Sequence, residues 1–366
     1  LNLTEGGISF ISHNLGKKMN VPQEVTRLGG IHYVGHLSGR GDRLSSKGRL
    51  ETGAGNADIQ LSKNGKNIQA KIATKGIALD RILANKTFGQ VATTIEVKGN
   101  KDHLVAKGEI SRFDYNKYSF RNISLDGQYN HGIVKGLASI DDPNIRVNIE
   151  GNYAIKGNKY AINTHIDHLQ PSILGVKMAD KGYSLDDIDL SANNQSSDSY
   201  LDLEAPFMSL HARGQYNLST LVSSIQNMIA EKLPTLPGIK KTKAKGDNDF
   251  TLQGNIYSTE VLNKILGIPL AISSPIHING NISEQSNELN LYLSAPLFSY
   301  NGKPFHNGNV ELTTLDNALN LEARITQGMP YEKAPEIKLK AAPADNVLST
   351  LLNYNNHSSK LPVSGL

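Results

Sequence analysis

The stretch Asn144-Ile-Arg-Val-Asn-Ile-Glu-Gly151 (NIRVNIEG) alternates strictly between apolar and polar residues. Ile145, Val147 and Ile149 therefore share one face of an extended strand, and the polar residues between them share the other face. The same period of two recurs in three further stretches: ELNLYLS (288–294), ALNLEARI (318–325) and EIKLKA (336–341). Strands that are apolar on one face only predict an antiparallel sheet with a single buried face.

The composition fits a chain of many short strands joined by tight turns. Apolar residues make up 38% of the 366 residues, aromatic residues reach 6%, Trp is absent and Gly is frequent at 33. Turn signals separate the strands at Asn64-Gly65, Asn130-His131-Gly132, Lys156-Gly157-Asn158 and Asn301-Gly302. Asn and Gly tolerate the positive φ angles of hairpin turns. We predict an all-β fold: an elongated, curled antiparallel sheet of trough-like repeats with a few short helices.

The sequence lacks the residues that several classes of function require. Cysteine is absent, which excludes disulfides and thiolate metal sites. The net charge of +4 is spread over both signs, and nucleic acid is not an expected partner. The sequence contains no Walker loop, no Gly-x-Ser-x-Gly and no His-Glu-x-x-His, so we expect neither catalysis nor a cofactor. It begins with Leu and has no apolar run of membrane length, which we interpret as an internal piece of a longer protein.

Two phrases recur at nearly the same offset. LDRIL (79–83) returns as LNKIL (262–266), 183 positions later, and the Phe-x-Tyr-Asn phrase at 113 returns at 298, 185 positions later. This spacing predicts repeat units of about 85 to 95 residues. We expect an N-terminal segment (1–75), a first repeat (76–165), an irregular repeat with an amphipathic helix near 218–232 (166–255), a second repeat (256–345) and the start of another (346–366).

The Leu-rich phrases predict short helical turns with one apolar face, because their apolar residues fall at i, i+3 and i+4. Such turns would act as local plugs or caps of the sheet. Their residues are Leu79, Ile82, Leu83, Leu262, Ile265 and Leu266. The pattern also occurs at 218–222 and 348–352, with a looser copy at 168–174.

An apolar sheet face has to be covered. A second sheet covers it in a sandwich, whereas stacked repeats can curl it into a trough. The alternation fits both arrangements, and ordinary core packing is the usual meaning of such stripes. The low aromatic content and the absence of Trp favour a thin or lipid-filled interior.

The chain resembles a known family over about residues 70–350. The segments that carry the resemblance are Lys75–Leu83, Thr94–Asn100, Phe113–Ile123, Lys135–Asn144 and Asn148–Gly151. They are similar to the middle part of the TamB-like translocation and assembly proteins of Bacteroides-type bacteria, within the broader AsmA-like group.

The resemblance implies a periplasmic β trough, anchored in the inner membrane by an N-terminal helix that this sequence does not contain. It implies phospholipid acyl chains as partners, and an outer-membrane barrel of the TamA/BamA type that is met through regions outside this sequence. It implies no catalytic residues. The expected function is to carry acyl chains between the inner and outer membranes along an apolar groove.

The expected groove residues are the apolar stripes: Ile95, Val97, Ile145, Val147, Ile149, Ile276, Ile278, Leu289, Leu291, Leu293, Leu319, Leu321 and Ile325. Three alternatives stay open. A scaffold for outer-membrane protein assembly would offer edge strands for β-augmentation. An adhesin would be a compact sandwich with a ligand patch, and an enzyme would hold acids or bases with perturbed pKa values in a polar pocket.

Four minor motifs have ordinary explanations that we prefer. His165-Ile-Asp-His168 lacks the convergent ligands of a metal site. Asp141-Asp142-Pro143-Asn144 lacks the spacing of a calcium loop and predicts a turn. Arg40-Gly41-Asp42 lies in a Gly/Ser-rich turn. The lysines at 240, 241, 243 and 245 predict an exposed linker, with contact to anionic lipid as the alternative.

Overall fold

The computed structural model divides into two compact units, Leu1–Val176 and Lys177–Leu366. The residues it describes are 2–3, 23–195, 199–217, 220–232, 241–242, 246–315, 318–330, 334–344 and 347–356. The predicted lysines at 240, 243 and 245 and the predicted helix start at Leu218 lie outside these residues.

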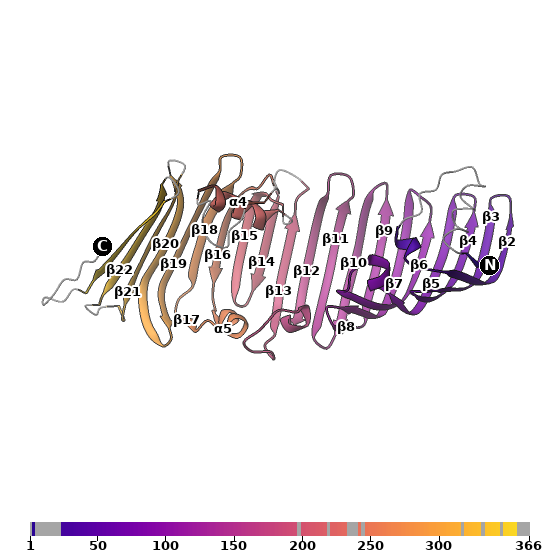
Figure 1. Cartoon of the computed structure of the whole chain (residues 1–366), viewed down its shortest axis with the longest axis horizontal. Coiled ribbons are helices and arrows are strands. Elements are labelled where there is room, and N and C mark those ends of the chain that lie inside the picture. The colour runs from indigo at the N-terminus through magenta and orange to yellow at the C-terminus, as the bar shows by residue number, and fades with distance from the viewer. Residues whose placement is uncertain are drawn as a thin grey trace. The chain divides into compact units, whose positions relative to one another are not determined.

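The first unit is an antiparallel sheet whose strands follow one another in chain order (Figure 1). Its elements are β1 (Asn2–Leu3), α2 (Gln23–Thr26), β2 (Ile31–Arg40), β3 (Arg43–Thr52), β4 (Gly55–Asn64), β5 (Asn67–Ala78), α3 (Leu79–Leu83), β6 (Phe88–Gly99), β7 (His103–Tyr115), β8 (Tyr118–Phe120), β9 (Ile123–Asn130), β10 (Ile133–Asp142), β11 (Ile145–Ala154), β12 (Lys159–Leu169) and the 3-10 helix η1 (Pro171–Leu174). Strands β2 to β7 each pair with the next, β7 pairs with both β8 and β9, and β9 to β12 continue the series.

The second unit repeats this arrangement. Its elements are β13 (Leu185–Asn193), β14 (Tyr200–Ala205), β15 (Met208–Gln215), α4 (Leu221–Lys232), β16 (Asp249–Ile256), α5 (Glu260–Leu266), β17 (Leu270–Ile272), β18 (Ile276–Ser283), β19 (Glu288–Tyr300), β20 (Lys303–Leu315), β21 (Ala318–Gln327), β22 (Glu336–Ala344) and β23 (Val347–Asn355). Here β16 pairs with β18 and the short β17 pairs with β19.

Each unit is a curled antiparallel sheet, and no pairing among the described residues joins its first strand to its last. The predicted all-β fold class with a few short helices is therefore confirmed. The boundaries of the five predicted segments stay predictions.

The recurring phrases adopt the same local structure in both units. Phe113 pairs with Phe120 across β7 and β8, and Phe298 pairs with Phe305 across β19 and β20. The turns that join these strands have matching positive φ angles, 48° and 70° at Asn116 and Lys117, and 50° and 72° at Asn301 and Gly302. Two positive φ angles in a two-residue loop define a type I′ turn, whose twist fits the flanking strands.

The short helices occur largely where the apolar spacing predicts them. The phrases at 79–83 and 262–266 form α3 and the end of α5, and both helices are followed by a left-handed residue, Ala84 and Gly267. The looser copy forms η1. The expected turn at 348–352 is wrong, because these residues belong to β23 and pair with β22, with Leu352 opposite Leu339.

The predicted amphipathic helix is present as α4. Among the described residues no helix combines the length and the apolar character that a membrane crossing requires.

In each unit a short helix packs against the apolar face and forms a buried core with it. In the first unit Phe120, Ile123 and Ile173 form a small buried cluster, in which η1 packs against the sheet. In the second unit α4 contacts β19 and β21, and Met228 of this helix is buried. These short helices cover part of the apolar face and leave the rest of it to the strands.

Candidate functional site

Cross-strand register gathers the apolar stripes of the first unit into continuous rows. Residues opposite one another in a ladder lie on the same sheet face. One row runs through β4, β5, β6, β7, β9, β10 and β11, and consists of Ile59, Ile72, Ile95, Gly108, Leu125, Ala138 and Ile149. The predicted residues Ile95 and Ile149 therefore belong to a single apolar row that crosses seven strands.

The neighbouring row on the same face contains almost no side-chain bulk. Gly127, Gly136 and Gly151 face one another across β9, β10 and β11, and Ala106 of β7 is opposite Gly127. Strand glycines mark places where a second group can approach the backbone closely. Because this row runs from strand to strand, the depression that it forms lies across the strands.

The two flanking rows are the walls of a groove of about 450 Å³ above the glycines. Leu125 and Ile149 line one side and Val134 and Tyr153 line the other. These four side chains are 36% to 40% exposed, so no second layer of described residues covers them. An uncovered apolar face distinguishes this unit from a sandwich, in which such residues would be fully buried.

The remaining predicted residues of the first unit extend the same face. Val97 lies opposite Ala106 and continues this row into β6, outside the groove itself. Val147 is 6% exposed, and Ile145 packs against the buried cluster beside η1. The apolar face therefore passes from a closed core at one end of the strands to an open groove farther along them.

The predicted stripes of the second unit also share one face. Ile278 and Leu293 belong to a row that consists of Leu190, Leu203, Leu210, Gly254, Ile278, Leu293, Val310, Ala323, Leu339 and Leu352. Leu291 and Leu321 belong to the next row, and Ile325 lies opposite Ile337.

The apolar face of the sheet is covered more completely in the second unit. Ile276, Leu289 and Leu319 are buried, at 5%, 7% and 8% exposed. At the strand end that carries Leu289, Asn248, which is fully buried, donates its amide to Ser224 of α4 at 2.9 Å. The hydrogen bond fixes α4 to the sheet, so in this unit the helix and the sheet form a core.

The predicted plug residues include the two most exposed of all the predicted apolar site residues. Neither α3 nor α5 contains a buried residue, and Leu83 and Leu266 are 44% and 61% exposed. Leu79, Ile82, Leu262 and Ile265 are partly buried. The role of these turns as plugs stays a prediction.

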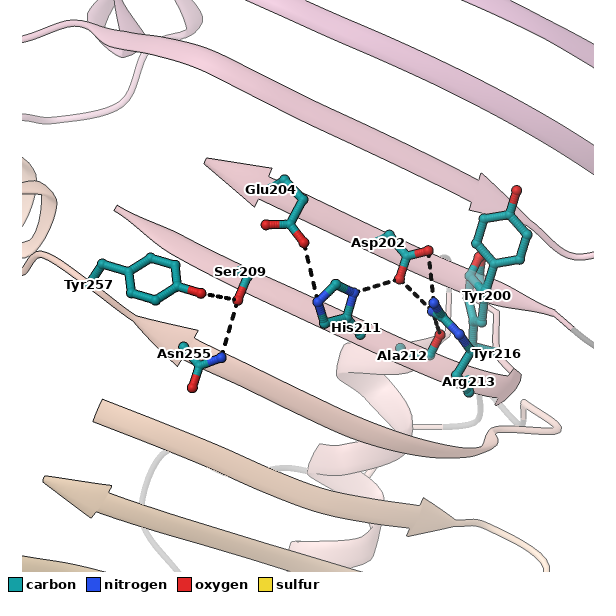
Figure 2. Close-up of polar contacts among 10 residues, drawn as sticks. All are labelled: Tyr200, Asp202, Glu204, Ser209, His211, Ala212, Arg213, Tyr216, Asn255 and Tyr257. Carbon is teal, nitrogen blue, oxygen red and sulfur yellow. Dashed lines mark hydrogen bonds and ion pairs between the residues drawn. The ribbon is translucent and has the colours of Figure 1, made fainter. Parts of the chain in front are cut away.

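The polar face of the second unit carries a charged cluster that was not predicted from the sequence (Figure 2). The imidazole of His211 lies between two carboxylates, with Nδ1 2.9 Å from Asp202 and Nε2 3.2 Å from Glu204. The guanidinium of Arg213 donates to both oxygens of Asp202 and lies over the ring of Tyr200. The contact of Nδ1 with Asp202 is a hydrogen bond, and the contact of Nε2 with Glu204 is an ion pair when the ring carries two protons.

Electrostatics hold Asp202 in its ionised form. Partial burial raises the pKa of this carboxyl group, but hydrogen bonds from Arg213 and His211 outweigh burial and lower the pKa below its ordinary value. The charge of Arg213 is thereby compensated by a bidentate partner. The cluster joins β14 to β15, and among the described residues no group of three His, Asp or Glu side chains could hold a metal ion.

The minor motifs have structural roles. Asp142, which is 2% exposed, ends β10 and accepts hydrogen bonds from Tyr118 and from the backbone of Arg121, so the predicted turn is confirmed. His165 and Asp167 lie 3.4 Å apart on β12. The Arg40-Gly41-Asp42 turn joins β2 and β3, with Gly41 at a φ of 58°.

Comparison with known proteins adds no relative. No family model matches the chain, and no curated protein or solved structure is significantly similar to it.

Proposed function

We propose that the first unit shelters the acyl chains of phospholipids in its open groove, as part of a periplasmic protein that carries lipid between two membranes. The observation that carries the proposal is the row of Gly127, Gly136 and Gly151, flanked by partly exposed apolar walls. The resemblance to TamB-like proteins points in the same direction.

The physical basis is the cost of apolar surface in water. The transfer of one methylene group from water to an apolar site is favourable by about 0.8 kcal/mol of free energy. A groove with a glycine floor lets a narrow chain lie close to the backbone, where it contacts both walls. Most of the lining is apolar, and the polar residues that border the groove are Lys107, Asp126, Lys135 and Asn152. The charged head group therefore stays in water at the open side.

The direction of the groove suits transport. It crosses β7, β9, β10 and β11, and neighbouring strands are about 4.8 Å apart. A chain that follows the floor moves from one strand to the next and meets the same type of residue each time. Because no polar pocket fixes the ligand, movement along the floor needs no exchange of specific hydrogen bonds.

Site-specific photo-crosslinking in cells that express the full-length protein tests the proposal. A photoreactive residue replaces Ile149 on the apolar face, and the matched control replaces Asn148 on the opposite face of the same strand. The expected result is phospholipid attached at 149 and none at 148, measured by mass spectrometry.

Equal labelling at both positions, or no lipid at either, contradicts the proposal. The second outcome would favour the alternative of a scaffold for outer-membrane protein assembly.

A further inference from the structure

The polar face of the second unit contains a groove of about 620 Å³ that the lipid proposal does not use. It crosses β15, β16, β18 and β19. The side chains that face it lie in three cross-strand rows, namely Asp249, Ser283 and Glu288, then Arg213, Thr251 and Asn281, then Gln253, Asn279 and Tyr292. Every one of these residues lies on the sheet face opposite to the apolar rows.

The row of Gln253, Asn279 and Tyr292 offers unused hydrogen-bonding groups beside an exposed ring. Within the part of the chain that the structure describes, the side chains of Gln253 and Asn279 have no hydrogen-bond partner, and both residues are exposed. Each amide presents a carbonyl acceptor and an NH₂ donor. Tyr292 follows Asn279 in the same row and is 43% exposed.

The charges around the groove argue against an anionic ligand. Arg213, the one cation among the described lining residues, is held by both oxygens of Asp202 (Figure 2). Asp249 and Glu288 place two carboxylates at one end. Anionic head groups or phosphates would meet these carboxylates without a free cation in compensation.

We propose that this groove binds a neutral oligosaccharide. The ring of Tyr292 packs against the apolar C–H face of one sugar. The amides of Gln253 and Asn279 each donate to one hydroxyl group and accept from its neighbour. Since adjacent strands are about 4.8 Å apart, the row spans about 10 Å from Gln253 to Tyr292, which accommodates two consecutive sugar rings.

Saturation-transfer NMR on the full chain tests this site with three probes: maltohexaose, cellohexaose and chitohexaose. The expected result is saturation transfer to at least one hexasaccharide, with an affinity that does not fall in higher salt because the ligand is neutral. Tyr292→Ala should weaken binding about tenfold, as expected for the loss of one aromatic contact. Replacing Gln253 and Asn279 together by Ala should weaken it at least as much.

Tyr300→Ala is the matched control, because Tyr300 lies on the same strand, is 47% exposed and is outside the groove. It should leave binding unchanged. The proposal is overturned if none of the three hexasaccharides binds, or if Tyr292→Ala and Tyr300→Ala have equal effects. It is also overturned if the groove, in a Tyr292-dependent manner, binds phosphatidylglycerol vesicles instead. None of these results depends on the lipid groove of the other unit.

Discussion

Replacing Gly127 by Leu should block the groove that we propose holds lipid, without disturbing the sheet. A Cβ at this position would meet its nearest neighbour, the carbonyl oxygen of Lys135, at 3.7 Å, which is ordinary contact. The same change at Gly136 would bring a Cβ within 2.8 Å of the carbonyl oxygen of Asp126 and force the backbone to move. A leucine at position 127 can therefore fill the groove while the backbone keeps its place, so this variant tests blocking of the groove rather than misfolding.

The magnitude follows from the methylenes that the new side chain displaces. A leucine side chain occupies the room of about four carbon atoms, and contact with four methylenes is worth about 3 kcal/mol when they are fully buried. The walls of the groove are more than one third exposed, so about half of this gain applies. A loss of about 1.5 kcal/mol corresponds to roughly tenfold less lipid bound.

The assay is lipid crosslinking from position 149 in the Gly127→Leu background, with the melting temperature measured in parallel. Gln128→Leu is the control, since it adds the same side chain to the same strand on the polar face. Glycine weakens a strand by about 0.5 to 1 kcal/mol relative to alanine, so the stability of Gly127→Leu should not fall. Undiminished crosslinking in a stably folded Gly127→Leu variant would refute a path over the glycine row.

Two further predictions concern the attachment of α4. Asn248→Ala should destabilise the protein by about 2 to 3 kcal/mol, because it removes two buried hydrogen bonds, the one that Asn248 donates to Ser224 and the one that it accepts from the backbone N–H of Asn217. Thermal unfolding, with the exposed-site variant Asn279→Ala as the control, measures the difference. Burial raises the pKa of Glu284, but hydrogen bonds from Ser224, Asn248 and the backbone of Gly246 outweigh burial and lower it below its ordinary value of 4.5. The stabilisation by this carboxylate should be complete above pH 4.5 and be lost as the pH falls through the lower pKa of the folded state, so the urea midpoints of wild type and Glu284→Gln should converge in acid.

The period of two was sufficient to predict the strands and their common apolar face, because side-chain direction in a strand depends on the local sequence alone. The type I′ turn at Asn301-Gly302 was predictable for the same reason. The turn at 348–352 was not, because Leu residues at i, i+3 and i+4 fit a helix until a partner strand is present. In the structure, residues 348–352 pair with β22 and therefore form a strand.

The glycines of this row can be recognised in the sequence itself. In β9, β10 and β11 a glycine occupies an apolar position of the alternation, as in Leu125-x-Gly127-x-Tyr129 and Ile149-x-Gly151-x-Tyr153. That these glycines meet depends on register, which long-range pairing fixes. The cluster around His211 and the buried Asn248 depend on register or helix placement in the same way.

The floor of the groove and its direction have one physical origin. In a meander with hairpin turns, register sets which residues stand opposite each other, and a single slip would send every side chain to the other face. Gly127, Gly136 and Gly151 lie on three strands joined by two hairpins, so the lengths of those two turns align the floor. Lengthening the β9–β10 turn by one residue would therefore interrupt the groove between Gly127 and Gly136 even though every apolar residue remained in the sequence. The continuity of the groove therefore depends on turn length as much as on hydrophobicity.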